Sequence, residues 1–357
     1  MLSAGMAEPL IIYGATGYSG RLLTSAAVER GLLPVLCGRN AAKLASLAQQ
    51  HGLEHRVAAV TDAQDLAWAF AGATVVVNAA GPFSKTAGPV LDACLAVGAH
   101  YLDITAEVPV IEAIAARHAA IAARGLMAMP AIGFDVVPTD CLAAHVARRL
   151  PQARRLAIAV TGLEFITRGS AKTLLEAVEF GVVRADGVVR RIPLGAVERV
   201  FDGDQGPRTC INVSLGDIAT AFYSTGIPNI ETYVDGTPLI RLMLASCRAF
   251  GGILGTGPMQ AWLGAWSDLL PENPVTDADD GADHAMEIMA EAEAADGTCV
   301  RSRLRTPEAY AFTAVTGSEI IGRVLDGDME PGFQTPSRVY GSEFVLGFPG
   351  VTRTDVA

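Results

Sequence analysis

Short apolar runs alternate with amphipathic segments along the first third of the chain. Runs rich in β-branched and apolar residues predict buried strands at residues 10–13, 34–37, 56–60, 74–78, 101–103 and 126–129. Between them, helical spacing of apolar positions predicts helices that open at Arg21 and span about 41–51, 63–70, 88–97 and 109–124. This alternation is typical of a parallel, doubly wound sheet.

Beyond Pro151 the order becomes mixed. Short runs predict strands at 155–161, 188–190, 197–201, 210–213 and about 231–234, and helices at 170–183, 217–223 and 307–325. Residues 286–294 and 298–304 indicate a hairpin closed by an Asp-Gly turn. The sequence therefore predicts an α/β protein, with an N-terminal Rossmann doubly wound parallel sheet plus a second mixed α+β domain. We place the dinucleotide-binding domain at 1–140, a substrate or dimerisation domain at 141–330, and a C-terminal segment that returns to the first domain at 331–357.

A glycine-rich turn follows the first predicted strand. Gly14, Gly17 and Gly20 stand three residues apart, between Tyr13 and the helix that opens at Arg21. Glycine lets the backbone approach a pyrophosphate, and the helix N-terminus offers that anion N–H groups and a favourable dipole. A tight turn without a ligand is the alternative, but a second strand about twenty residues on supplies the context that a dinucleotide site requires.

The end of the second predicted strand favours NADP over NAD. In NAD enzymes an Asp or Glu usually stands there and binds the ribose hydroxyls. This chain instead has Gly38-Arg39-Asn40, followed by Lys43. An arginine cannot accept a hydrogen bond from a 2′-hydroxyl, but its planar fork suits a 2′-phosphate. The alternative is an arginine solvated in a loop.

Composition excludes several other classes. Half of the 357 residues are hydrophobic, and a net charge of −11 leaves no basic excess for binding nucleic acid. The six cysteines and six histidines are scattered without metal-ligand spacing, so we expect no disulfide framework, no metal site and a cytoplasmic location. The first nine residues do not have the pattern of a signal peptide.

Two segments bear on the polarity of the substrate. Residues 249–267 contain five glycines and no charged side chain, which favours an apolar pocket wall or a docking surface for an apolar acceptor over a membrane span. Arg301, Arg303 and Arg305 alternate along a predicted strand and share one face. We interpret them as a solvated face opposite an acidic stretch, rather than as a site for a polyanion.

Two enzyme families that use a similar turn find no support in the sequence. Extended short-chain dehydrogenases need a Tyr-x-x-x-Lys pair, and no tyrosine of this chain has a lysine four residues later. Acyl-phosphate and semialdehyde reductases need a nucleophilic cysteine at a helix start. Cys141 is the nearest candidate, but the neighbouring Asp140 disfavours a thiolate, so we interpret Cys141 as a core residue.

Several short segments combine into a recognisable pattern. They are residues 13–20 (YGATGYSG), 38–40 (GRN), 78–83 (NAAGPF), 100–105 (HYLDIT), 133–138 (GFDVVP) with Asp140, 167–173 (TRGSAKT) and 335–336 (TP). Together they resemble the saccharopine dehydrogenase-like reductases, a family that includes saccharopine reductases and trans-acting enoyl reductases of lipid biosynthesis. The resemblance extends over nearly the whole chain. It is closer to the enoyl-reductase branch, because saccharopine reductases have a sequence similar to Gly-Leu-Asp-Pro-Gly at the position where this chain has Gly-Phe-Asp-Val-Val.

The resemblance implies a cofactor site on the turns that follow the strands, the same places that the predicted sheet indicates. The implied cofactor-binding residues are Gly14, Ala15, Thr16, Gly17, Tyr18, Ser19, Gly20, Arg39, Asn40, Lys43, Asn78, Ala79, Ala80, Gly81, Pro82 and Phe83, of which the last six would lie near the nicotinamide ribose.

Three residues are candidates for catalysis: Asp135, Tyr223 and Lys172. Asp135 would anchor a substrate amine or orient a water; the alternative is that it caps the helix that starts near Pro138. Tyr223 and Tyr310 are candidate proton donors, and Arg168 and Lys172 are candidate partners for a carboxylate or phosphate. A structural role is the alternative for each of these four.

The sequence thus predicts an NADPH-dependent reductase that transfers hydride to an activated C=C of an apolar or lipid-like small-molecule substrate. Reduction of the C=N bond of a saccharopine-type adduct is an alternative, and a non-enzymatic NADP-binding redox sensor is a second one. No nucleic-acid partner is expected. A homodimer, and contact with a membrane surface or an acyl carrier, are compatible with this interpretation.

Overall fold

The computed structural model describes residues 10–162, 180–238, 240–242, 244–245 and 285–356. The chain divides into two compact units that are described separately below. The first unit contains the residues up to Phe134 together with Tyr310–Thr335, and the second contains Asp135–Ala309 and Pro336–Ala357. The first unit is therefore built from two separate stretches of the sequence.

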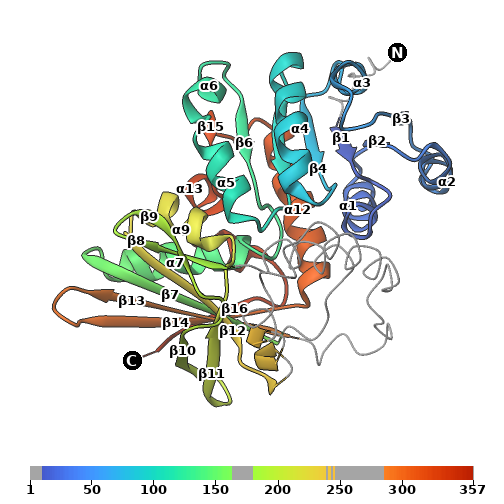
Figure 1. The fold of residues 1–357 in the computed structure, drawn as a ribbon. Helices are drawn as coiled ribbons and strands as arrows, with labels where there is room; N and C mark the ends of the chain where they lie inside the picture. Colours follow the sequence, from blue (N-terminus) through green and yellow to red (C-terminus); the bar gives the residue numbers. More distant parts are fainter. Residues whose placement is uncertain (1–9, 163–179, 239, 243, 246–284, 357) are drawn as a thin grey trace. The chain divides into compact units, whose positions relative to one another are not determined.

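The first unit is organised around a seven-stranded parallel sheet (Figure 1). Its order is β15-β6-β5-β4-β1-β2-β3. The strands are β1 (Leu10–Tyr13), β2 (Val35–Gly38), β3 (His55–Val57), β4 (Val75–Asn78), β5 (His100–Asp103), β6 (Met127–Met129) and β15 (Gly332–Phe333). Every residue of β1, β2 and β4 is buried, as expected for parallel strands covered on both faces. The strand order reverses between β1 and β4, which is where ligands bind to open α/β sheets.

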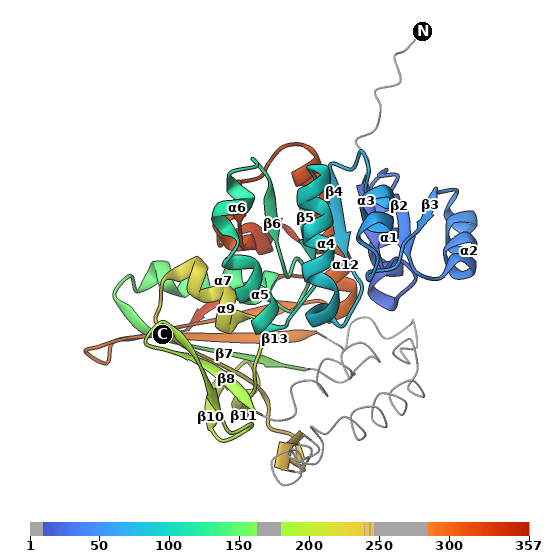
Figure 2. The same cartoon turned by 45° about the horizontal axis from the view of Figure 1, so that its top comes forward.

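Within the first unit, helices follow strands β1 to β5. They are α1 (Tyr18–Glu29), α2 (Ala41–His51), α3 (Ala63–Ala69), α4 (Phe83–Val97), α5 (Val108–Ala115) and α6 (His118–Ala122), and α12 (Ala309–Leu325) precedes β15. Helices α3, α4 and α5 pack in a row, and Figures 1 and 2 show α4 and α5 side by side. The predicted helix 109–124 is in fact two helices that break at Arg117, and the helix predicted from residue 88 begins earlier, at Phe83.

Helix α12 belongs to the first unit, although the sequence-based boundaries had assigned it to the second domain. Its side chains explain the difference. Thr316 Oγ1 donates to the carbonyl of Ile132 (3.1 Å), and the amide of Phe134 donates to Thr313 Oγ1 (3.0 Å). Strand β15 pairs with β6 in the first sheet, whereas Pro336 and the residues after it belong to the second unit.

The second unit contains a mixed sheet of nine strands. Its main order is β10-β11-β12-β7-β13-β14-β16, with β8 joined to β12 and β9 joined to β8. The strands are β7 (Ala153–Thr161), β8 (Gly181–Ala185), β9 (Val188–Ile192), β10 (Glu198–Gly203), β11 (Gly206–Asn212), β12 (Asn229–Asp235), β13 (Met286–Ala294), β14 (Cys299–Thr306) and β16 (Thr352–Val356). The helices are α7 (Val137–Arg149), α9 (Asp217–Thr225) and α13 (Pro336–Tyr340), with a 3₁₀ turn at Phe344–Gly347. The predicted fold class is confirmed, with helices α7 and α9 packed on the sheet (Figure 1).

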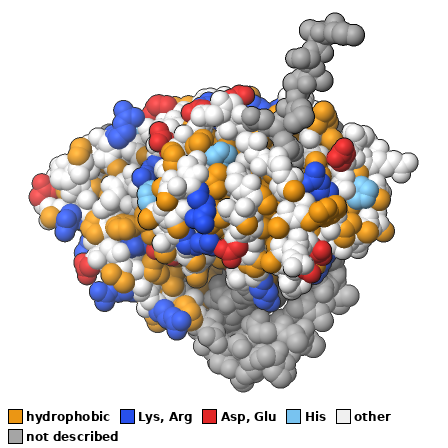
Figure 3. Space-filling model, turned by 90° about the horizontal axis from the view of Figure 1, so that it is seen from above, with side chains coloured by type: hydrophobic (Ala, Val, Ile, Leu, Met, Phe, Trp, Pro, Cys, Tyr) orange, Lys and Arg blue, Asp and Glu red, His pale blue; other side chains and the backbone are white. Residues whose placement is uncertain are grey.

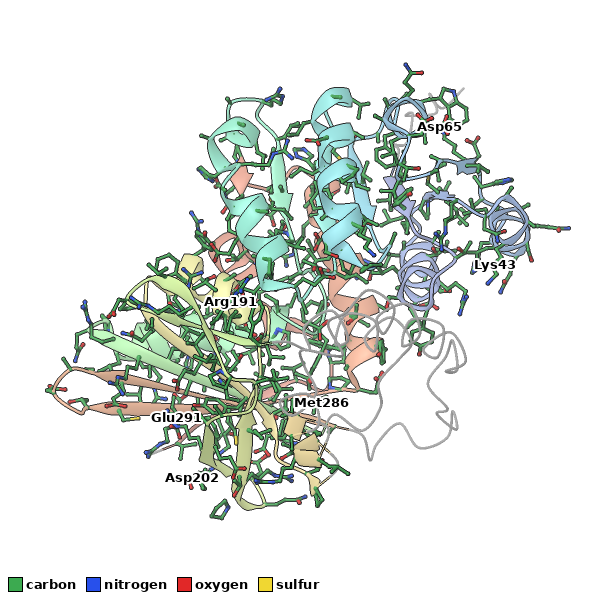
Figure 4. The ribbon with its side chains drawn as sticks, viewed as in Figure 1. Lys43, Asp65, Arg191, Asp202, Met286 and Glu291 are labelled. Atoms are coloured by element: carbon green, nitrogen blue, oxygen red, sulfur yellow. The ribbon has the colours of Figure 1, made fainter. Side chains whose placement is uncertain are left out.

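Two details of the second unit differ from the expectations. Residues 181–183, predicted as the end of a helix, lie in strand β8; the rest of that prediction falls mostly outside the described residues. The arginines of β14 share one face as predicted, but that face is an ion-pair network rather than a freely solvated surface. Arg301 Nε lies 3.1 Å from Glu291 Oε1, and Glu291, labelled in Figure 4, is only 7% exposed.

Candidate functional site

The turn between β1 and α1 has the geometry of an anion site. Gly14 adopts a φ of +84°, and its amide donates to the carbonyl of Cys37 (2.8 Å). The amide of Gly17 donates to the carbonyl of Gly14 (3.0 Å), and Gly17 is the N-cap of α1 without a side-chain cap. The first N–H groups of such a helix, and the positive end of its dipole, can bind a negatively charged ligand.

Close backbone packing explains two of the three glycines. A Cβ on Gly14 would lie 2.7 Å from the amide nitrogen of Ala80, at the end of β4. A Cβ on Gly20 would lie 2.3 Å from the carbonyl oxygen of Gly14 and 2.9 Å from Cα of Ala15. These approaches leave no room for a side chain, so the turn brings backbone close to the position of a dinucleotide.

The residues expected to select the cofactor lie together after β2. Arg39, Asn40 and Lys43 are all exposed, and Figure 4 shows Lys43 on α2. Asn40 has a second role, because its Oδ1 accepts a hydrogen bond from the Lys43 amide (3.0 Å) and caps α2. The Arg39 guanidinium therefore stands at the end of β2, where a 2′-phosphate would be bound.

The segment from Asn78 to Phe83, which includes a cis peptide bond before Pro82, is held by a buried polar chain. Asn78 Oδ1 accepts from the Ala80 amide (3.0 Å), and Asn78 Nδ2 donates to Thr86 Oγ1 (3.2 Å) and Tyr101 Oη (3.4 Å). Tyr101 Oη donates to Asp103 Oδ2 (2.7 Å). The Asn78 side chain is fully buried and supports the turn from the protein interior, so contacts with a cofactor would come from the other residues of the turn.

Asp103 connects this chain to the turn after β6. Its Oδ1 accepts from the amides of Thr105 (2.9 Å) and Ala131 (2.8 Å), and Ala131 adopts a positive φ of 61°. Burial raises the pKa of the Asp103 carboxyl to about 6, although the hydrogen bonds from Tyr101 and the two amides oppose that rise.

Sequence reasoning missed Glu107, which reaches across to α4. Its Oε1 accepts from the Phe83 amide (2.8 Å) and its Oε2 from the Ser84 amide (2.7 Å). The two partners are 24 and 23 residues away in sequence, so no local pattern could have indicated the contact.

Asp135 lies just before α7 in the second unit. The side chain has solvent-accessible surface, yet desolvation by the surrounding protein raises the pKa of its carboxyl to about 6. Val136 is the N-cap of α7, and among the described residues no hydrogen bond to the Asp135 carboxylate supports the capping alternative.

A second carboxyl that the sequence did not single out is Asp217, at the start of α9. It is fully buried, and neither of its oxygens has a hydrogen-bond partner among the described residues. Burial raises its pKa well above the usual range; the Thr139 side chain opposes that rise, and the nearby charges of Asp140 and Asp135 add to it. Asp140, by contrast, is well bonded, because it accepts from Ser224 Oγ (2.5 Å) and the Ser337 amide (2.8 Å).

Two of the remaining candidates, Tyr223 and Tyr310, belong to different units. Tyr223 packs edge-on against Phe222, whose ring lies 4.1 Å from the Arg184 guanidinium. In the first unit, Tyr310 packs edge-on against Tyr18 with ring centroids 5.1 Å apart. Lys172, Arg168 and the charge-free segment 249–267 lie outside the described residues.

The other exclusions concern cysteines, metals and membranes. Cys141 is fully buried, and burial together with Asp140 raises the pKa of its thiol, so its interpretation as a core residue is confirmed. Within the described ranges, no group of three or more metal-ligating side chains occurs. No helix in the same ranges combines the length and apolarity required to cross a bilayer. On the face seen in Figure 3, Lys and Arg side chains stand among hydrophobic and acidic ones.

Comparison with known proteins agrees with the geometry of the first unit. Residues 10–129 match the family described as "Saccharopine dehydrogenase NADP binding domain". The chain is 31% identical over 153 residues to a trans-acting enoyl reductase of Mycobacterium leprae, a match that covers 41% of this chain and 37% of that protein. It is 29% identical over 192 residues to the Mycobacterium ulcerans enzyme of the same name, over 50% and 46% of the two chains. The chain thus spans less than half the length of these relatives.

A solved structure extends the similarity in fold to the whole chain. Saccharopine dehydrogenase (L-Glu forming) from Saccharomyces cerevisiae aligns with a TM-score of 0.64 over 98% of this chain and all of that one. At 12% sequence identity, this likeness concerns the fold alone.

Proposed function

We propose, from the match of residues 10–129 to the saccharopine dehydrogenase NADP-binding domain family, that this protein is an NADPH-dependent reductase. It transfers hydride to an activated C=C bond, of the enoyl or enone type, in an apolar or lipid-like substrate. The observation that carries this choice is the match to trans-acting enoyl reductases, which in the Mycobacterium ulcerans protein extends over half of the chain. The Gly-Phe-Asp-Val-Val sequence at 133–137 supports the same branch.

The residues present in the first unit fit the cofactor. The tight glycine turn, in which backbone packs directly against Gly14 and Gly20, and the start of α1 suit a pyrophosphate. The exposed Arg39 guanidinium suits a 2′-phosphate, which supports the proposed preference for NADPH over NADH. When bound, NADPH supplies the hydride.

The protein must then supply a proton and a fixed geometry. Asp135 is our candidate for holding or orienting that proton, because its carboxyl reaches solvent and has a pKa of about 6, close to neutral pH. Tyr223 remains a candidate proton donor, and Lys172 a candidate partner for a carboxylate or phosphate of the substrate. If Asp135 donates the proton, turnover should fall as the pH rises through about 6, because only the protonated carboxyl can donate.

A substrate screen tests the proposal. NADPH oxidation is followed at 340 nm with enoyl thioesters, with α,β-unsaturated ketones, and with an amino acid plus a carbonyl compound that form an imine. Turnover with the first two classes supports the proposal. Turnover only with the imine-forming pair would show that C=N reduction, the alternative, is the activity.

Binding without turnover would have a different meaning. If NADPH binds tightly but no acceptor of any class is reduced, the redox-sensor alternative is favoured over an enzyme. The homodimer, the acyl-carrier or membrane contact, and the cytoplasmic location stay predictions.

A further inference from the structure

Glu107 occupies an unusual position between two helices. It is the N-cap residue of α5, and its carbonyl accepts the amides of Val110 (2.9 Å) and Ile111 (3.1 Å). The side chain of an N-cap residue commonly accepts an amide of its own helix. The Glu107 carboxylate makes no such bond, and instead accepts the first two amides of α4, from Phe83 and Ser84.

Helix α4 depends on this contact for its cap. Its own N-cap residue is Pro82, which has no side-chain group that could accept a hydrogen bond and forms no cap. The bidentate carboxylate therefore accepts hydrogen bonds from two of the amides at the helix start. It also places a negative charge at the positive end of the α4 dipole. The negative charge would repel a cofactor phosphate from this helix start.

The same contact fixes the segment expected beside the nicotinamide ribose. One end of this segment is held by Ala80, whose amide donates to Asn78 Oδ1 and whose carbonyl accepts from Thr86 Oγ1 (2.5 Å). The other end is held at Phe83 and Ser84 by Glu107. The segment also touches the glycine turn, since a Cβ on Gly14 would meet the backbone of Ala80 at 2.7 Å.

Glu107 is itself held in place. Its amide donates to Thr105 Oγ1 (3.1 Å), and the Thr105 amide donates to Asp103 Oδ1 (2.9 Å). The end of β5 is therefore connected through two residues to the start of α4.

We propose that Glu107 is a positioning residue that holds residues 81–84 in the shape required by the nicotinamide half of the cofactor. This inference rests on the proposed function only in requiring that NADPH binds to the first unit. The adenosine half, which would contact Arg39 and the start of α1, does not depend on Glu107.

The test compares two ligands that differ only in the nicotinamide end. The dissociation constants of NADPH and of 2′-phospho-ADP-ribose, which lacks the nicotinamide, are measured by calorimetry for the wild type, Glu107→Ala and Glu107→Gln. The Ala variant should bind NADPH about tenfold more weakly, and the Gln variant, which keeps one acceptor, by an intermediate factor. Both variants should bind 2′-phospho-ADP-ribose within about twofold of the wild type. Glu54→Gln makes the same chemical change at an exposed position of this unit and should alter neither constant.

Two results would overturn the inference. Equal weakening of both ligands, accompanied by a lower melting temperature, would show that Glu107 only stabilises the fold. Unchanged binding of NADPH in both variants would show that the contact does not shape the site. Failure of the wild type to bind NADPH would be a different result, because it would refute the proposed function itself.

Discussion

Replacing Gly20 by alanine tests the close approach of α1 to the glycine turn. The added Cβ would lie 2.3 Å from the Gly14 carbonyl oxygen and 2.9 and 3.0 Å from Cα and C of Ala15. All three are backbone atoms and cannot rotate away. Ordinary contact begins near 3.4 Å, so α1 would have to move by about 1 Å relative to β1.

The expected magnitude follows from two opposing effects. Alanine in place of glycine inside a helix normally stabilises it by about 1 kcal/mol. Overpacking costs up to about 3 kcal/mol, and the upper end applies because the obstacle is backbone. The net loss is about 2 kcal/mol, or a decrease in melting temperature of about 4–8 °C for a unit of this size. Because the start of α1 would move with the helix, NADPH should bind at least about tenfold more weakly.

Thermal unfolding followed by circular dichroism and NADPH titration by calorimetry measure both effects. Gly322→Ala is the matched control, because Gly322 lies within α12 and an added Cβ would meet no atom within 4 Å. That variant should be as stable as the wild type or more so, with unchanged NADPH affinity. If Gly20→Ala also keeps its melting temperature and its affinity, the glycine turn does not work as described above.

Three further substitutions examine the cofactor preference and the two carboxyls of the second unit. Arg39→Asp should weaken NADPH binding by about 1.5–3 kcal/mol, the range for hydrogen bonds to charged groups, as measured by calorimetry; equal affinity of the wild type for NADPH and NADH would contradict this reasoning. Asp217→Asn should stabilise the protein in urea unfolding, and more at pH 8 than at pH 5. Burial raises the pKa of Asp217 in the folded state, so the wild type loses stability as the pH rises above the unfolded pKa of about 4. A pH-independent effect would show that the pKa of Asp217 does not change on folding. Asp135→Asn should keep the melting temperature and NADPH affinity but lower turnover at least about tenfold, or about 1.4 kcal/mol of barrier; full turnover in this variant would remove Asp135 from the mechanism.

The local part of the fold could be predicted from the sequence. Buried parallel strands such as Leu10–Tyr13 and Val75–Asn78 are almost continuous apolar runs, and a glycine-rich turn between a strand and a helix is typical of a dinucleotide site. The Asp-Gly turn likewise indicated the β13–β14 hairpin, which the register confirms. For residues 10–129, the family resemblance read from short motifs is confirmed by the match to the NADP-binding domain family.

The long-range part could not be predicted. Helix α4 begins at Phe83, where the Glu107 carboxylate from beyond β5 caps the helix. No residue near Phe83 in the sequence predicts this contact. Asp217 looks like an ordinary acidic residue in the first turn of a helix, and only the packing of α9 shows that it is buried without a partner among the described residues. The residues that form α12 have a helical pattern, but that pattern does not predict which of the two units the apolar face of the helix packs against.

The two-segment construction of the first unit has a consequence for its folding during synthesis. The chain leaves this unit at Phe134 and returns at Tyr310. Until the ribosome has made residues 310–335, the edge of β6 has no β15 beside it, and Leu23 of α1 lacks the close contact with Gly317 of α12. An unpaired strand edge and an uncovered apolar surface are features that promote aggregation. The nascent N-terminal portion would therefore be a substrate for chaperones, and truncations ending before β15 should be poorly soluble however complete the cofactor turn is.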